Sequence, residues 1–246
     1  MARSRMQQSV PSVQTAPRRS RVALELLWVS LGVGLLMGLL LRWGGLGAAD
    51  GLAGMNALQL MGLLLLQNLL AVGSIMAFLH PEGKGLSSLG FRQRPWGKEV
   101  ALGLALLAPV LVGALLLETL LLHFLPVLHN VEENPILSML TGPQEVAAIL
   151  VASVLAGGVG EEIIRAFVLR RFETHLGGMR VGLVVWSLAF GAMHLDQGVD
   201  KALVVSLLGL VFGLLYAWRR SPVAAMVVHG AFNVANTMAA YLLLGA

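Results

Sequence analysis

Two adjacent carboxylates and a guanidinium lie in the middle of a strongly apolar stretch of this chain. Glu161, Glu162 and Arg165 interrupt the run 144–171, which is long and apolar enough to cross a bilayer. A charge at that depth costs from about 3 to more than 10 kcal/mol, depending on the reference state, so such charges are rare unless they have a function. The three residues therefore predict an intramembrane active site or an ion path.

Three more polar residues are expected at the same depth. His194 lies in the next apolar run, and His229 and Asn233 lie in the last one. At 1.5 Å per helical residue, Glu161 lies roughly 15 Å from the basic end of the run 144–171. His194 lies roughly 21 Å from the basic end of its own run. On the same scale, His229 lies roughly 10 Å and Asn233 roughly 16 Å from the corresponding end of the last run. Side chains from three spans should therefore meet in one slab of the membrane.

These side chains suit the addition of water to an amide. A carboxylate in a cavity can deprotonate a water as general base, and a histidine beside it can share that water. A second histidine and an asparagine can donate hydrogen bonds to the oxyanion that forms. The set thus fits peptide-bond hydrolysis with no cofactor and no Ser or Cys nucleophile. The same residues leave zinc as an alternative, bound by Glu161, His194 and His229 with a fourth position open to water.

Helical spacing also predicts how the charges are paired. Glu161 and Arg165 are four residues apart and share a face, whereas Glu162 is turned by about 100° toward a second partner. A structural alternative is a buried ion pair that fixes helix register, but it leaves one carboxylate without a role. Small residues one turn earlier favour close approach of another helix, or a loosened helix beside a cavity. They are Gly157, Gly158 and Gly160.

The composition predicts an all-α, multi-pass transmembrane bundle. Of the 246 residues, 57% are hydrophobic and 12% are charged, and the apolar runs are continuous rather than alternating. Seven spans are expected, with room for an eighth short helix. Their ranges are 23–42, 57–80, 99–128, 144–171, 179–197, 200–218 and 222–245.

The distribution of charge predicts the topology. The net charge is +4, and most Arg and Lys lie at span ends that share one side if there are seven spans. We therefore expect a cytoplasmic N-terminus, with residues 1–22 as a disordered basic tail and residues 23–246 as one integral membrane domain, in the cell membrane. An Arg- and Ser-rich start also resembles an organelle transit peptide.

Membrane lipids are expected partners and nucleic acid is not. The absence of cysteine excludes disulfides and cysteine catalysis.

The polar motifs resemble those of the CAAX protease and bacteriocin-processing (CPBP or Abi) family of intramembrane proteases, which includes the type II CAAX prenyl endopeptidases. That family carries a Glu-Glu pair followed by Arg, then Phe-x-x-x-His, then His-x-x-x-Asn, on separate membrane helices. The resemblance covers about residues 144–240. One departure is that only Ile163 and Ile164 separate Glu162 from Arg165, where three residues are usual.

The resemblance implies a role for each residue. Glu161 would activate the water together with His194, and His229 and Asn233 would form the oxyanion site. Glu162 and Arg165 would orient the first glutamate and steady its helix. The family is often called a metalloprotease, although its prenyl endopeptidases look like glutamate-dependent enzymes without a required metal. The implied substrate is a peptide or protein, prenylated or not.

Three functions are consistent with the sequence. The first is an intramembrane endopeptidase. The second is a non-catalytic membrane protein of the same fold, for bacteriocin immunity or scaffolding, which the shortened first motif favours. The third is a transporter or proton path, for which repeated halves with broken helices would be expected and are not seen.

Overall fold

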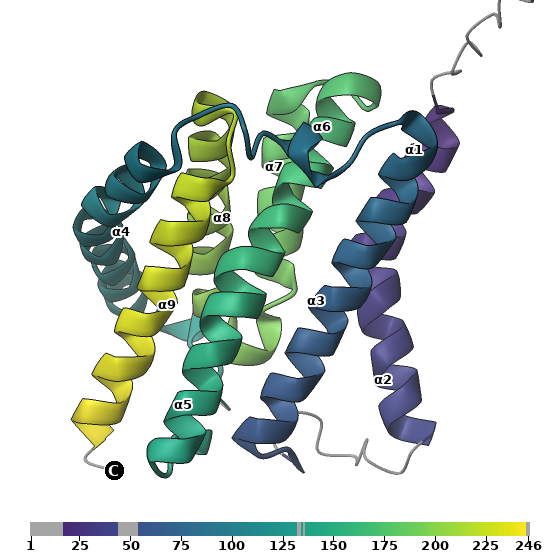
Figure 1. The fold of residues 1–246 in the computed structure, drawn as a ribbon. Helices are drawn as coiled ribbons and strands as arrows, with labels where there is room; N and C mark the ends of the chain where they lie inside the picture. Colours follow the sequence, from purple (N-terminus) through teal and green to yellow (C-terminus); the bar gives the residue numbers. More distant parts are fainter. Residues whose placement is uncertain (1–16, 44–53, 132–133, 135, 245–246) are drawn as a thin grey trace, which may run out of the picture.

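Every regular element that the structure describes is a helix. The computed structural model describes residues 17–43, 54–131, 134 and 136–244, and no strand occurs among them (Figure 1). The long elements are α1 (Arg19–Leu27), α2 (Val33–Trp43), α3 (Ala57–Leu79), α4 (Trp96–Phe124), α5 (Pro143–Ala152), α6 (Glu162–His175), α7 (Met179–Ala192), α8 (Val199–Arg219) and α9 (Val223–Leu244). The predicted all-α class is confirmed.

Two of the membrane rods contain a π-helical segment. The segment η1 (Trp28–Gly32) joins α1 to α2, and η7 (Ser153–Glu161) joins α5 to α6. Short 3₁₀ turns cap or connect the rods, among them η3 (His80–Glu82), η5 (Pro126–Leu128) and η8 (Leu195–Gln197). The helix α4 ends two residues before Pro126, as expected for a residue that cannot continue a helix.

The predicted spans are present. Over the described ranges, six helical rods are long and apolar enough to cross a membrane, and α7 is a shorter apolar helix, so about seven helices form the bundle and no eighth apolar helix is found. Residues 1–16 of the predicted tail lie outside the described residues. The helix α1 begins at Arg19, so the last four residues of that predicted tail are helical.

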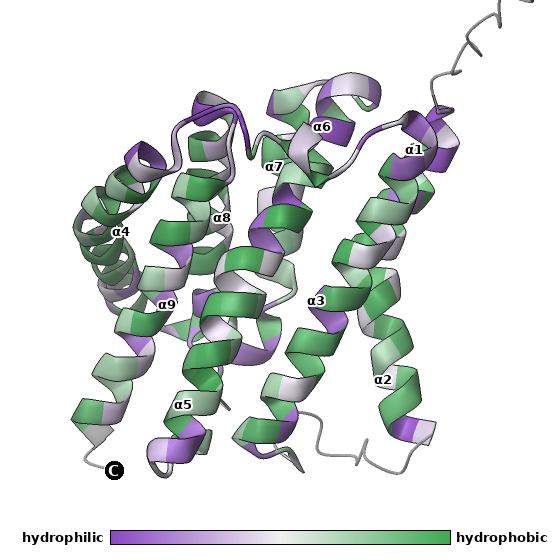
Figure 2. Ribbon diagram, in the orientation of Figure 1, coloured by the Kyte–Doolittle hydropathy of each residue, from purple (hydrophilic) through white to green (hydrophobic). Residues whose placement is uncertain are grey.

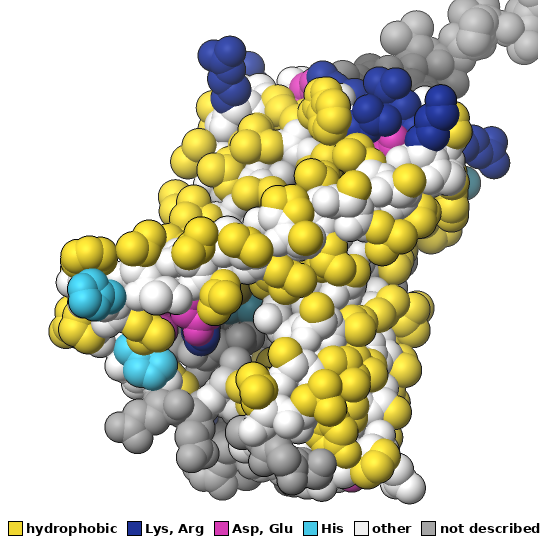
Figure 3. Space-filling view, turned by 90° about the vertical axis from the view of Figure 1, so that its left-hand side faces the viewer, with side chains coloured by type: hydrophobic (Ala, Val, Ile, Leu, Met, Phe, Trp, Pro, Cys, Tyr) yellow, Lys and Arg dark blue, Asp and Glu magenta, His cyan; other side chains and the backbone are white. Residues whose placement is uncertain are grey.

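The surface is that of an integral membrane protein. The rods are apolar along their length and polar mostly near their ends (Figure 2). On the face that carries α4, hydrophobic side chains cover the middle, and Lys and Arg gather at one end (Figure 3). Leu104, Leu115 and Leu120 of α4 are each more than half exposed, which suits contact with lipid tails.

The helix α6 lies at the centre of the bundle. Its successive residues Ala166, Phe167, Val168 and Leu169 are at most 2% exposed, so it is covered on every side. It packs against α1, α3, α7 and α8. Glu162, the first residue of α6, is therefore carried by an enclosed helix.

The helix α7 is shorter than predicted. The expected span 179–197 ends as a helix at Ala192, after 14 residues. The reason is local: His194 Nδ1 lies 2.8 Å from the Phe190 carbonyl, which would accept a hydrogen bond from the His194 N–H in a continuing helix. The His194 N–H bonds instead to the Gly191 carbonyl, so the histidine side chain caps the helix that carries it.

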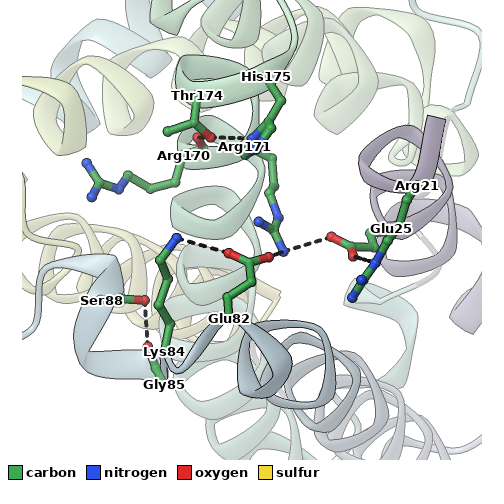
Figure 4. Close-up of polar contacts among 10 residues, drawn as sticks. All are labelled: Arg21, Glu25, Glu82, Lys84, Gly85, Ser88, Arg170, Arg171, Thr174 and His175. Carbon is green, nitrogen blue, oxygen red and sulfur yellow. Dashed lines mark hydrogen bonds and ion pairs between the residues drawn. The ribbon is translucent and has the colours of Figure 1, made fainter. Parts of the chain in front are cut away.

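A buried set of ion pairs joins three distant segments at the basic end of the bundle (Figure 4). Arg171 of α6 lies 2.8 Å from Glu25 of α1 and 2.6 Å from Glu82 of η3. Glu25 also pairs with Arg21, and Glu82 with Lys84. Because the Arg171 side chain is 5% exposed, its charge depends on these carboxylates.

We expect Arg171→Ala to lower the free energy of unfolding by about 3–5 kcal/mol, because it leaves two carboxylates without their shared cation. Thermal unfolding in detergent micelles measures the effect. Arg180→Ala, which removes an exposed cation at the same end, is the control and should keep the parent midpoint. Equal midpoints for the two variants would contradict this account of the ion pairs.

Candidate active site

The site is built around Glu162. Its Oε1 accepts a hydrogen bond from Arg165 Nη1 and lies 2.8 Å from His229 Nδ1. Glu162 is 1% and Arg165 0% exposed, so both charges are enclosed by protein. This carboxylate therefore joins α6 to α9.

The expected pair between Glu161 and Arg165 is wrong, because Glu162 makes the ion pair. Glu162 and Arg165 both belong to α6, where residues three apart are neighbours on the helix surface. Glu161 is the last residue of η7, and its side chain is 30% exposed, 3.8 Å from His229 Nε2. The pair thus contains one enclosed, paired carboxylate and one accessible carboxylate.

Two aromatic rings enclose the Arg165 guanidinium. Its Cζ lies 4.5 Å from the ring centre of Phe190 on α7 and 5.6 Å from that of Phe212 on α8. Phe212 also stacks on the His229 imidazole, with ring centres 4.8 Å apart. Phe212 was missed in the sequence, where nothing distinguishes it from the other apolar residues of its span.

The two site histidines flank the ring of Phe190. Its centre lies 5.0 Å from that of the His194 imidazole and 6.2 Å from that of His229. The structure thus brings His194, at the end of α7, beside the residues that α6 and α9 supply. All three expected spans contribute to one site.

Each site histidine has its Nδ1 atom committed. In His194 the partner is a carbonyl oxygen, and in His229 it is a carboxylate oxygen, so Nδ1 carries the proton in both rings. In the neutral ring the Nε2 atom is then a lone-pair acceptor. Both rings can therefore hold or deprotonate a water through Nε2, and His229 can donate from Nε2 only as the imidazolium.

The close helix approach expected of the glycines occurs. A Cβ on Gly158 would lie 2.8 Å from Gly230 Cα, so η7 and α9 touch through their backbones. A Cβ on Gly157 would lie 2.7 Å from Asn233 Nδ2, which places that amide against η7. The segment around the glycines is π-helical, a form that is common at functional sites.

The donors of the zinc alternative do not converge. Glu161, His194 and His229 offer a carboxylate and two imidazoles, which zinc accepts as ligands. In the described part of the chain, however, no three side chains of His, Asp or Glu come together closely enough to hold a metal ion. We therefore route no step of the chemistry through zinc.

Comparison with known proteins agrees with the motifs. Residues 143–235 match the family model described as type II CAAX prenyl endopeptidase Rce1-like, which confirms the resemblance over that segment. The match spans α5, η7, α6, α7, α8 and the first part of α9, and includes all six predicted site residues. No curated protein and no solved structure matches the chain.

Proposed function

We propose that this chain, with its Rce1-like domain at residues 143–235, is an intramembrane endopeptidase that hydrolyses a peptide bond with an activated water. The observation that carries the proposal is the accessible Glu161 carboxylate beside His229, next to a second carboxylate that is fully enclosed. One glutamate is free to react, and the other holds the site together.

The chemistry follows from the protonation of these groups. Glu161 takes a proton from a water that His194 Nε2 also holds, and the water oxygen bonds to the peptide carbonyl carbon. The oxyanion accepts a hydrogen bond from Asn233 Nδ2. The enclosed Glu162 carboxylate accepts a hydrogen bond from His229 Nδ1 and so holds that ring beside Glu161. When the C–N bond breaks, the proton held by Glu161 passes to the leaving nitrogen.

The substrate we propose is a prenylated peptide. An apolar groove of about 490 Å³ runs between α4, η7 and α9, and Leu107, Val159 and Gly230 line it. Gly230 directly follows His229 on α9 and is turned from it by about 100°, so a lipid chain in this groove would lie on a neighbouring face of that helix. The groove and the family description of the matched segment support this substrate class.

We further propose that the N-terminus is cytoplasmic and that the protein lies in the cell membrane. The end of the bundle that holds Lys84, Arg92 and Arg180 is the one that the positive-inside rule assigns to the cytoplasm. The site then lies within reach of that side.

Glu161→Gln should reduce cleavage of a membrane peptide by at least about 100-fold, because an amide cannot take the proton of the water. The rate is measured in proteoliposomes, with the thermal midpoint as a test of folding. Glu145→Gln, at an acidic residue in the first turn of α5, is the matched control and should keep the parent rate. Parent activity in Glu161→Gln would contradict the proposal and favour a non-catalytic or transport function.

Cleavage should persist after prolonged dialysis against a chelator, with zinc well below one ion per chain by elemental analysis. The physical reason is that a carboxylate and an imidazole suffice to deprotonate the water. Loss of activity on chelation, restored by added zinc, would contradict this mechanism and assign Glu161, His194 and His229 as ligands.

A farnesylated peptide should be cleaved with a kcat/KM at least about tenfold above that of the same peptide without the lipid, since each buried CH₂ favours binding. Leu107→Trp, which fills the groove, should remove that preference. Val112→Trp, at a lipid-exposed position on the same helix, is the control. Equal kcat/KM values for the two peptides would contradict a prenylated substrate.

A further inference from the structure

Asn68 is a polar residue in the apolar helix α3, and only one of the two polar atoms of its amide has a hydrogen-bond partner among the described residues. Its Nδ2 donates to the Leu64 carbonyl one turn earlier, at 3.0 Å. Its Oδ1 is buried and has no hydrogen-bond partner among the described residues. A buried acceptor without a donor is unfavourable where no bulk water can reach it. The packing of α3 alone therefore gives no reason for an asparagine here.

The Oδ1 atom points at Gly160 of η7. A Cβ added to Gly160 would lie 1.9 Å from Asn68 Oδ1 and 2.6 Å from Asn68 Cγ. The amide thus occupies the space of the side chain that Gly160 lacks, with its oxygen against the glycine Cα–H. Because Nδ2 is held by Leu64, the amide cannot swing away without losing that hydrogen bond.

Gly160 directly precedes Glu161, which has little else to hold it. Glu162 is fixed by Arg165 and by His229, whereas among the described residues the one polar contact of the Glu161 carboxylate within 4 Å is His229 Nε2 at 3.8 Å. That distance is too long for a hydrogen bond. The direction of the Glu161 side chain therefore depends on how the backbone of η7 is held.

We propose that Asn68 is a positioning residue for Glu161. Its amide sets the distance between α3 and η7, and this fixes the direction in which the Glu161 carboxylate points. The inference rests on the proposed role of Glu161 as general base. It extends the site to a helix that lies outside residues 143–235, the segment matched by the family model.

The test is a double-mutant cycle of parent, Asn68→Ala, Gly160→Ala and the double variant. We expect Gly160→Ala to lower kcat by about 100-fold with little change in KM, because the added methyl meets the amide and displaces Glu161. We expect Asn68→Ala to lower kcat by about tenfold, because the spacing is then no longer fixed. The double variant should return to the kcat of Asn68→Ala, since the methyl then has space.

Kinetic constants are normalised to folded protein, and the thermal midpoint of each variant is measured alongside. Gly73→Ala is the matched control, because Gly73 is also on α3 and an added Cβ there meets nothing within 4 Å. It should keep the parent kcat. A purely structural role for Asn68 would lower the midpoint and leave the kcat of the folded fraction unchanged, and that result would overturn the proposal.

Two further outcomes are separable. Parent kcat in Gly160→Ala, or a double variant as slow as Gly160→Ala, would overturn the role of Asn68 and leave the protease proposal standing. A parent protein that cleaves no peptide would remove the proposed function itself.

Discussion

The interaction on which the site depends is the enclosed ion pair between Glu162 and Arg165. Neither charge could stay at this depth alone, because the surroundings offer no water to solvate it. Their mutual contact brings other elements in: Phe190 from α7 and Phe212 from α8 pack against the guanidinium, and His229 from α9 bonds to the carboxylate. Four helices meet at one pair of opposite charges. The pair therefore holds the four helices together, and Glu161 beside it takes no part in that ion pair.

Much of the fold and the identity of the polar residues were predictable, because membrane physics leaves strong marks in a sequence. Long apolar runs predicted the rods, and charges inside them predicted the site. The depths estimated for His194 and His229 agree with the structure, in which both rings lie beside Phe190. The glycines at 157, 158 and 160 predicted the close approach of another helix, and in the structure Gly158 meets Gly230 of α9.

What the sequence could not give is the rotation of individual side chains. The choice of Glu162 over Glu161 as the partner of Arg165 depends on where η7 changes to α6, and no residue pattern marks that point. The early end of α7 depends on a hydrogen bond from the His194 side chain to its own helix. Phe212 has no signal of its own, and Asn68, an amide in an apolar span, was not singled out from the sequence. Each of these features is decided by tertiary contacts rather than by local preference.

The π-helical segment also explains how one continuous rod serves two sets of neighbours. In a regular helix each residue turns the chain by about 100°, so removing a single residue from η7 would rotate α5 against α6 by that angle. Either α5 would turn its packed face away from α3 and α9, or α6 would turn and carry the pair of Glu162 and Arg165 away from its neighbours on other helices. The wider winding of η7 sets the rotation of α5 relative to α6. Single-residue deletions should therefore be far less tolerated in Ser153–Glu161 than substitutions on its lipid-facing side.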